Sequence, residues 1–291
     1  MTKLVLLGAV LTGCTTDTKN LERKIDALTA EVKAMRSGGG AVGGGGPARG
    51  ERPQPPQPNP AKTYAMTIDG DPFEGPADAK ITIVKSYDYA CPFCEGVRPT
   101  IAKIVEKYGS DVRIVSKVNV IHPDNAMAGG LAFCAAAKQG KAKEMEALIW
   151  DKGFLTKPRK GGNLDISVVK DGDKQANCWD TAGGCANVVG YANELGLDVE
   201  RFKADMREGS ACHEQIKRTT SPLRAMGTTG TPALYVNGRY IPGGAAPFER
   251  IAPVIDEELQ KANDAIGKGL ATQADYYEKI VVGQGLKKLD G

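Results

Sequence analysis

The chain has 291 residues, with 38 basic and 35 acidic side chains and a net charge of +3. This length is enough for one or two domains with a sizeable core. A nearly balanced charge gives no indication of a nucleic-acid partner. The chain contains only two histidines, which argues against a histidine-based metal site or a Ser-His-Asp catalytic site. We therefore expect a protein that uses neither a metal nor a cofactor.

The N-terminus resembles the signal peptide of bacterial lipoproteins. A short basic start is followed by an apolar run from Leu4 to Leu11, which is too short to span a bilayer. The next residues, ending in Gly13-Cys14, resemble a lipobox, which implies cleavage after residue 13 and lipid attachment to Cys14. The alternative is an ordinary signal peptide with a chance cysteine. Both interpretations predict export, and the lipobox places the protein at the periplasmic face of a bacterial membrane, where disulfides persist.

Residues 14–61 are expected to form a spacer. Between residues 20 and 36 the apolar positions alternate spacings of four and three, which is the seam of a coiled coil: Leu21, Ile25, Leu28, Val32 and Met35. The pattern favours a parallel homo-oligomer, but two heptads are marginal alone, so a monomeric, partly frayed helix is the alternative. A Gly-rich stretch over residues 37–46 and a Pro-rich stretch over 47–60 predict a flexible and then extended tether.

The motif Cys91-Pro92-Phe93-Cys94 is the candidate active site. It follows the apolar run at Ile81–Tyr87, which predicts a buried strand, and it opens a segment with helical periodicity. Cys91 would lie at the helix N-terminus, where unpaired N–H groups and the helix dipole stabilise a thiolate. Pro92 suits the first helical position, and Cys94 lies one turn further on. These features predict a redox-active pair rather than a structural disulfide.

The other elements predict a mixed α/β domain. A helix after Cys91, kinked or broken near Pro99, leads to a second strand over residues 112–120 and completes a βαβ unit with parallel strands. Residues 125–218 read as helical, and residues 64–68 as a short edge strand. The dipeptide Asn237-Gly238 between apolar runs predicts a hairpin with a type I′ turn. Two further helices are expected, one after Phe248 and one within residues 272–289.

Two separate motifs resemble the DsbA-like thiol-disulfide oxidoreductases. The first is Tyr87-Asp88-Tyr89 before Cys-Pro-Phe-Cys, and the second is the tract from Gly230 through Thr231-Pro232 to Gly238. The resemblance covers residues 62–261. It implies a thioredoxin fold in two parts, residues 62–124 and 220–291, with an inserted α-helical domain at residues 125–219.

The resemblance also implies roles for individual residues. Thr231-Pro232 would be a cis peptide bond facing the disulfide, and substrate would bind along Pro92, Phe93, Thr231 and Pro232. The implied partners are exported, cysteine-containing protein substrates and a membrane redox partner. The tethered layout is similar to that of the copper-sensitivity suppressor isomerases, whose N-terminal helices assemble the subunits.

Two residues depart from the family pattern. Phe93 stands where many DsbA-like oxidants have a histidine that helps to hold the thiolate. Lys85 stands where a buried carboxylate often assists proton transfer, so an inward Lys85 would favour the thiolate by its charge and an outward one would have no effect. Asp88 lies near Cys94 in sequence and is a candidate for the proton acceptor of Cys94. The alternative is that Asp88 only caps a turn. The direction of exchange therefore stays open.

Four further cysteines lie in the predicted insert, at positions 134, 178, 185 and 212. Four cysteines allow three pairings. We favour Cys178–Cys185, because Gly183-Gly184 between them can turn, together with Cys134–Cys212. A four-cysteine zinc site is the rival interpretation, although its usual C-x-x-C ligand pairs are missing.

The leading functional hypothesis is an enzyme that forms, reduces or isomerises disulfides in exported proteins through Cys91 and Cys94. The alternative is a lipid-anchored peptide-binding or chaperone module that uses the groove around Phe93 and Pro232 without redox turnover.

Overall fold

The computed structural model describes residues 23–27, 29, 56–154, 168–171 and 174–289. The chain divides into two units, residues 1–54 and 55–291. In the first unit, residues 23–27 and 29 are helical, within the predicted coiled coil. The signal peptide, Cys14 and most of the tether lie outside the described residues. No helix among the described residues is long and apolar enough to cross a membrane.

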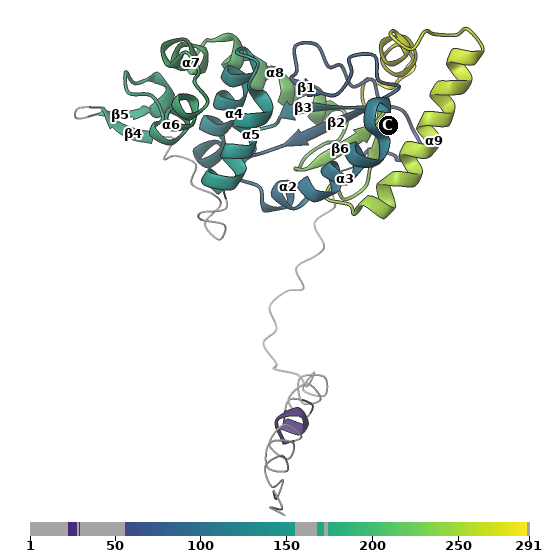
Figure 1. Ribbon diagram of the computed structural model, residues 1–291, viewed down its shortest axis with the longest axis horizontal. Helices are drawn as coiled ribbons and strands as arrows, with labels where there is room; N and C mark the ends of the chain where they lie inside the picture. Colours follow the sequence, from purple (N-terminus) through teal and green to yellow (C-terminus); the bar gives the residue numbers. More distant parts are fainter. Residues whose placement is uncertain (1–22, 28, 30–55, 155–167, 172–173, 290–291) are drawn as a thin grey trace, which may run out of the picture. The chain divides into compact units, whose positions relative to one another are not determined.

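A five-stranded mixed sheet forms the centre of the second unit (Figure 1). Its spatial order is β1-β3-β2-β6-β7. The strands are β1 (Phe73–Glu74), β2 (Ile81–Tyr87), β3 (Val112–Val118), β6 (Ala233–Val236) and β7 (Arg239–Ile241). Strands β2 and β3 pair in parallel over their whole length, and the other neighbouring pairs are antiparallel. The predicted parallel pairing is confirmed.

Both faces of the sheet are covered, as the continuous apolar runs predict. On one face, Ile81 and Ile83 of β2 pack with residues of helices α3 (Arg98–Tyr108) and α9 (Phe248–Gly267). On the other face, Val84 packs in a second cluster with Leu223 of helix α8 (Ala211–Ala225). All residues of β2 and β3 are buried. The strand that carries the chain to Cys91 is therefore held from both sides.

The helix after Cys91 is divided in two. Helix α2 covers Pro92–Gly96 and α3 covers Arg98–Tyr108, with Val97 between them. The predicted break is confirmed, and Pro99 lies in the first turn of α3, where its missing N–H leaves no intrahelical bond unmade. A short 3₁₀ turn, Gly109–Asp111, then leads into β3 and completes the βαβ unit.

The segment between β3 and β6 is mostly helical. It contains α4 (Pro123–Ala137), α5 (Ala142–Leu148), a π-helical turn (Ile149–Phe154), a 3₁₀ turn (Cys178–Asp180), α6 (Ala186–Glu194), α7 (Val199–Met206) and α8. The helix expected to begin near Leu197 is confirmed, with Asp198 as its N-cap, because its side chain accepts the Arg201 N–H. The helical prediction was wrong only where an antiparallel hairpin of β4 (Val168–Asp171) and β5 (Lys174–Asn177) interrupts the helices.

The second part of the sheet follows α8. The predicted hairpin is confirmed: Asn237 and Gly238 join β6 to β7, with φ angles of 44° and 76°. The expected helix after Phe248 is α9, and the expected tail helix is the π-helical segment Tyr277–Val282. The predicted edge strand at residues 64–68 was wrong, because Tyr64 forms only an isolated bridge to Leu286 and the edge position is taken by β1.

Candidate active site

Strand β2 and helix α2 place the two cysteines of the motif at one end of the sheet. Cys91 is the N-cap of α2, with extended backbone angles, and Pro92 occupies the first turn. The N–H of Cys94 donates to the carbonyl oxygen of Cys91 at 3.0 Å, which closes the first turn. Both cysteines are free thiols and are 4% and 2% exposed. The structure therefore describes the reduced form of an adjacent pair.

The loop before β6 faces this pair. The Thr231–Pro232 bond is cis. The thiol of Cys91 donates to the carbonyl oxygen of Thr231 at 3.2 Å, across 140 residues of sequence. The loop is supported from behind by Gly244, whose φ is 55° and where an added Cβ would collide with the Pro232 carbonyl oxygen. The two motifs that are distant in sequence thus meet at Cys91.

The surroundings of Cys91 favour its thiolate. A hydrogen bond from the Cys94 thiol, one from Thr231 and the backbone N–H groups of Cys94 and Phe93 lower the pKa of Cys91 to about 6, against the opposing effect of burial. The hydroxyl of Thr231 is buried and has no other partner among the described residues, so it can donate to the sulfur once Cys91 ionises. With this pKa, most of the Cys91 side chain is a thiolate at neutral pH.

Cys94 has the opposite character. Burial, followed by the adjacent Cys91 sulfur, raises the pKa of Cys94 well above its ordinary range, although the backbone N–H of Asp88 donates to its sulfur. A buried, protonated thiol does not attack solvent reagents, but it stabilises the neighbouring thiolate by donating a hydrogen bond. The pair is therefore asymmetric: the surroundings of Cys91 favour its ionised form, and those of Cys94 favour its protonated form.

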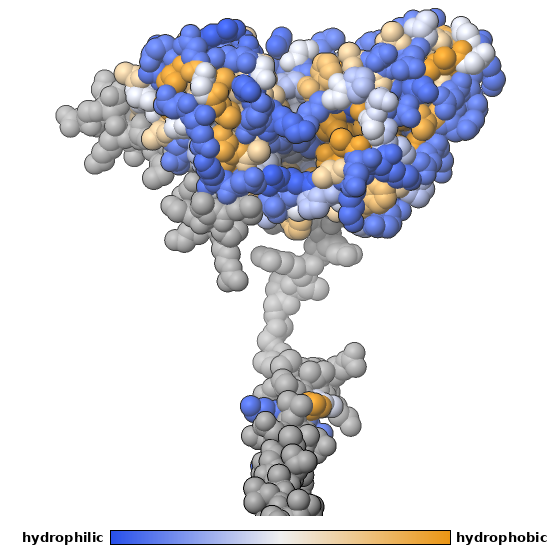
Figure 2. All heavy atoms as spheres, viewed as in Figure 1, coloured by the Kyte–Doolittle hydropathy of each residue, from blue (hydrophilic) through white to orange (hydrophobic). Residues whose placement is uncertain are grey.

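Phe93 is the apolar residue that the motif presents to solvent, with 67% of its surface exposed. On the face of the domain that Figure 2 shows, hydrophilic and hydrophobic areas alternate, with a hollow near the middle. Pro92 is also exposed, whereas Pro232 is buried behind the cis bond. Of the four predicted substrate-binding residues, Phe93 thus offers the largest apolar contact beside Cys91.

Lys85 points inward and is paired. Its ammonium lies 2.6 Å from a carboxylate oxygen of Glu146 on α5, and the two side chains are 11% and 12% exposed. The indole N–H of Trp150 donates to the same oxygen at 3.4 Å, and the ammonium lies 4.4 Å from the centre of the Tyr87 ring. Glu146 thus offsets the Lys85 charge, so the inward lysine does not act as a free cation near the thiols.

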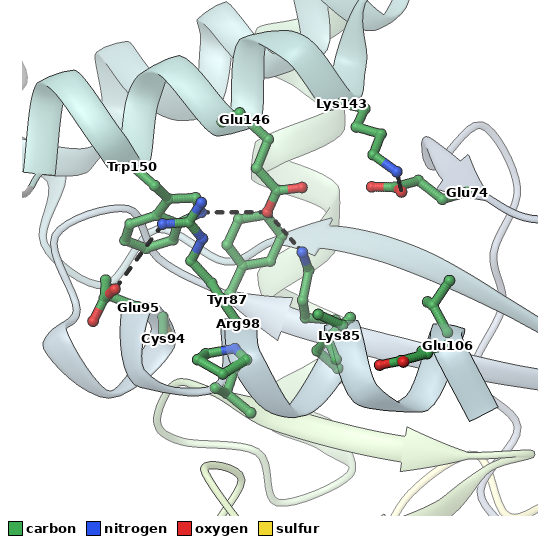
Figure 3. A pocket seen from close by; sticks show the side chains of 16 residues that line it. Glu74, Lys85, Tyr87, Cys94, Glu95, Arg98, Glu106, Lys143, Glu146 and Trp150 are labelled. Atoms are coloured by element: carbon green, nitrogen blue, oxygen red, sulfur yellow. Dashed lines mark hydrogen bonds and ion pairs between the residues drawn. The ribbon is translucent and has the colours of Figure 1, made fainter. Parts of the chain in front are cut away.

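This pair lies at a pocket between α3 and α5, shown in Figure 3. The pocket has a volume of about 650 Å³. Cys94 and Tyr87 contribute to its wall, together with apolar residues of α3 such as Ile101 and Val105. Cys94 therefore borders a recess whose walls come from α3 and from the inserted helix α5.

The other four cysteines form two disulfides. Cys134 of α4 is bonded to Cys212 of α8, and Cys178 is bonded to Cys185 at the start of α6. These are the pairings that the sequence favours. Because all four sulfurs are used, the rival zinc site is excluded at these positions. The predicted lipidation residue, Cys14, lies outside the described residues.

Sequence reasoning missed two residues that shape the site. Glu146 reaches Lys85 from 61 residues away, and no local pattern marks such a partner. Gly244 lies in a Gly-Gly pair that reads as an ordinary turn, and only its approach to Pro232 shows its role. Asp88, which the sequence places beside the motif, contacts the loop between β3 and α4 through its side chain.

Comparisons with known proteins agree with this geometry. A family model described as thioredoxin matches residues 67–257. Among curated proteins, a Na(+)/H(+) antiporter NhaA of Herminiimonas arsenicoxydans is 30% identical over 173 residues, covering 60% of this chain and 23% of that protein. The chain thus spans about a quarter of the length of the curated relatives it matches.

Two solved structures are similar in fold to about two thirds of this chain. A variant of alpha-DsbA1 from Wolbachia pipientis has a TM-score of 0.53 at 15% identity and covers 69% of this chain and 96% of its own. A thioredoxin-like oxidoreductase from Silicibacter pomeroyi DSS-3 has a TM-score of 0.50 at 22% identity and covers 66% and 94%. These likenesses concern the fold of the chain.

Proposed function

The chain belongs to the thioredoxin family, whose model matches residues 67–257, and on this premise we propose that it is a thiol:disulfide oxidoreductase of exported proteins. The observation that carries the proposal is the asymmetry of the two thiols. Cys91 has a pKa of about 6 and faces the cis Thr231–Pro232 loop, while Cys94 is buried one helical turn away. Low thiolate pKa at a helix N-terminus is typical of reactive cysteines.

The proposed reaction is thiol–disulfide exchange through a mixed disulfide. In the oxidising direction, a substrate thiolate attacks Cys91 of the disulfide form. The Cys91–Cys94 bond breaks, and Cys94 leaves as a thiolate that takes up a proton. A second substrate thiolate then attacks the substrate sulfur of the mixed disulfide and releases the Cys91 thiolate. The substrate loses two electrons and the enzyme gains them.

In the reducing or isomerising direction, the Cys91 thiolate attacks a substrate disulfide. The substrate's second sulfur leaves as a thiolate and is protonated. Cys94 then loses its proton and attacks Cys91, which frees the reduced substrate and forms the Cys91–Cys94 disulfide. Isomerisation occurs when a substrate thiolate resolves the mixed disulfide instead, so that the enzyme returns reduced.

The pKa of Cys91 bears on the direction of exchange. A value of about 6 lies between those of thioredoxin (about 7) and DsbA (about 3.5). Because a more stable thiolate makes the disulfide more oxidising, we propose a reduction potential between about −270 and about −120 mV. Phe93, which carries no positive charge, is consistent with a couple that is less oxidising than DsbA.

We further propose that the domain works outside the cytoplasm, tethered through Cys14 to a membrane. Support comes from the lipobox-like sequence and from the two disulfides in the helical segment, which persist in oxidising compartments. The substrates would then be exported proteins with cysteines, recharged by a membrane redox partner. The full chain should appear in the membrane fraction, and the Cys14→Ala variant should leave it.

A binding or chaperone module without turnover is the second candidate, and the exposed Phe93 favours it. The two candidates are separated by the Cys91→Ala variant in assays of insulin reduction and of scrambled-substrate refolding. The enzyme hypothesis predicts that both activities are lost. Phe93→Ser is the companion variant, in which the thiols remain. The binding module instead predicts no insulin reduction by the wild type, and an effect on refolding that is unchanged in Cys91→Ala and lost in Phe93→Ser.

A further inference from the structure

Asp88 is a buried carboxylate three residues before Cys91. It is 0% exposed, and both of its oxygens accept backbone hydrogen bonds. Oδ1 accepts the N–H of Ala90 at 2.7 Å. Oδ2 accepts the N–H groups of Ile121 and His122 at 2.7 and 2.9 Å. Three backbone donors thus converge on one side chain.

The charge of Asp88 has no full cationic partner among the described residues. A histidine, His122, lies beside it, with Nδ1 3.3 Å from Oδ1 and a side chain that is 48% exposed. No lysine or arginine in the described part of the chain forms an ion pair with Asp88. Burying a carboxylate is costly unless hydrogen bonds satisfy it. The arrangement is therefore stabilised by its contacts to backbone N–H groups.

The backbone of Asp88 contacts both reactive cysteines. Its carbonyl oxygen accepts the N–H of Cys91 at 3.1 Å, and its N–H donates to the sulfur of Cys94. Its side chain, in turn, binds the loop that leads from β3 into α4. One residue therefore connects the turn before the nucleophile, the resolving thiol and the start of the inserted helices.

We propose that Asp88 is a positioning residue, whose carboxylate fixes the turn that presents Cys91 to the N–H groups of α2. This inference rests on the proposed function for its purpose, although the position of the turn can be measured without any substrate. With the carboxylate in place, the N–H groups of Phe93 and Cys94 point at the Cys91 sulfur. Without it, the turn loses three hydrogen bonds and its link to α4.

The negative charge of Asp88 and its role in holding the turn have opposite effects on the pKa of Cys91. If Asp88 acted mainly through its negative charge, it would disfavour the nearby thiolate, and neutralising it would lower the pKa of Cys91. If it acts by holding the turn, its loss weakens the hydrogen bonds to the thiolate, and the pKa of Cys91 rises. The sign of the shift therefore distinguishes the two mechanisms.

The first test uses Asp88→Asn and Asp88→Glu in the full chain. Asparagine keeps the shape but has a single acceptor oxygen, so either amide orientation sets its NH₂ against a backbone N–H. Glutamate keeps the charge but displaces the carboxylate. We expect the pKa of Cys91, followed by ultraviolet absorbance of its thiolate, to rise by about one unit in both variants. The control is Asp124→Asn, which replaces an exposed carboxylate in the first turn of α4 and should leave the pKa of Cys91 unchanged.

The proposal is overturned if the pKa of Cys91 falls or stays constant in Asp88→Asn, or if Asp88→Glu behaves as the wild type. Should either variant fail to fold, amide hydrogen exchange in the unchanged protein decides. The amides of Ala90, Ile121 and His122 should exchange slowly. Rapid exchange of all three would contradict the proposal that the Asp88 carboxylate holds these N–H groups. Neither measurement needs redox turnover, so a failure of the proposed function would leave these results interpretable.

Discussion

The low pKa of Cys91 arises from a few short contacts around one sulfur atom. The thiol of Cys94, the N–H groups of α2 and the hydroxyl of Thr231 are all donors that favour the charged form. These donors come from two segments, α2 and the loop before β6, so the pKa of Cys91 depends on how the two segments face each other. A small displacement of any donor is expected to raise the pKa of Cys91.

The pH dependence of alkylation tests this environment. The rate of iodoacetamide modification of Cys91 should rise with pH around a midpoint near 6, because only the thiolate reacts. Cys94 should stay unmodified throughout, since burial raises its pKa. Peptide mapping by mass spectrometry distinguishes the two sites. A midpoint near the ordinary cysteine value, or equal labelling of both sulfurs, would contradict the assignment.

The same pKa predicts a stability difference between the redox forms. The Cys91 pKa is lower in the folded protein than in the unfolded chain, so its stabilising effect is present above the unfolded value and is lost as pH falls through about 6. The disulfide form lacks this titration. The free energy of unfolding of the reduced form, relative to the oxidised form, should therefore decrease from pH 9 to pH 5, in urea unfolding at each pH.

Gly244 is predicted to be irreplaceable, unlike its neighbour. Gly243 and Gly244 both have positive φ angles, so alanine at either position costs about 1–2 kcal/mol of backbone strain. A Cβ at Gly243 meets nothing, whereas one at Gly244 would overlap the Pro232 carbonyl oxygen. Gly244→Ala should therefore lower both stability and insulin reduction well beyond Gly243→Ala. Equal effects of the two substitutions, by urea unfolding and turnover, would contradict this role.

At the scale of elements, an ion pair joins the sheet to the inserted helices. Lys85 of β2 and Glu146 of α5 are nearly buried, and breaking such a pair costs about 3–5 kcal/mol because it leaves one charge unpaired. We therefore expect Glu146→Gln to be strongly destabilising in urea unfolding. Glu144→Gln, which replaces a half-exposed carboxylate in an ion pair with Lys141 on the same helix, is the matched control and should have little effect.

The double variant Lys85→Met/Glu146→Leu completes this test. It removes both charges, so it should recover most of the stability lost in Glu146→Gln. If instead Glu146→Gln is no less stable than Glu144→Gln, the pair does not hold α5 against β2.

The two disulfides should contribute unequally to stability. In the chain-entropy model, the bridge across 78 residues from Cys134 to Cys212 contributes about 4.5 kcal/mol, and the bridge across 7 residues from Cys178 to Cys185 about 2.5 kcal/mol. The Cys134→Ala/Cys212→Ala variant should thus unfold at lower urea concentration than Cys178→Ala/Cys185→Ala. The reverse order would show that α4 and α8 are held together mainly by packing.

The elements that sequence predicts are those with local signals. The apolar runs of β2 and β3 and the Asn237-Gly238 turn each contain their own determinant, and all three were predicted. The β4–β5 hairpin was missed, because Lys170, Asp171 and Lys174 give no apolar alternation. The Lys85–Glu146 pair could not be predicted either, since its partners come from segments that only the tertiary fold brings together.

For the whole molecule, the predicted architecture is confirmed: a thioredoxin fold with an added, mainly helical segment. The sheet supplies the two fixed supports of the site, β2 leading to Cys91 and β6 following the cis loop. The inserted helices contact this region through the Lys85–Glu146 pair and through the loop before α4, whose N–H groups bind Asp88. The spacer before residue 56 is proposed to give this domain its reach from a membrane.

Trapping of a mixed disulfide is the most direct test of the central claim that Cys91 attacks and Cys94 resolves. In the Cys94→Ala variant, the Cys91 thiolate is expected to accumulate as a covalent adduct with a disulfide-containing protein substrate, seen by non-reducing electrophoresis and lost on reduction. The Cys91→Ala variant should give no adduct. An adduct through Cys94 in Cys91→Ala, or none through Cys91 in Cys94→Ala, would contradict the assignment of the two sulfurs.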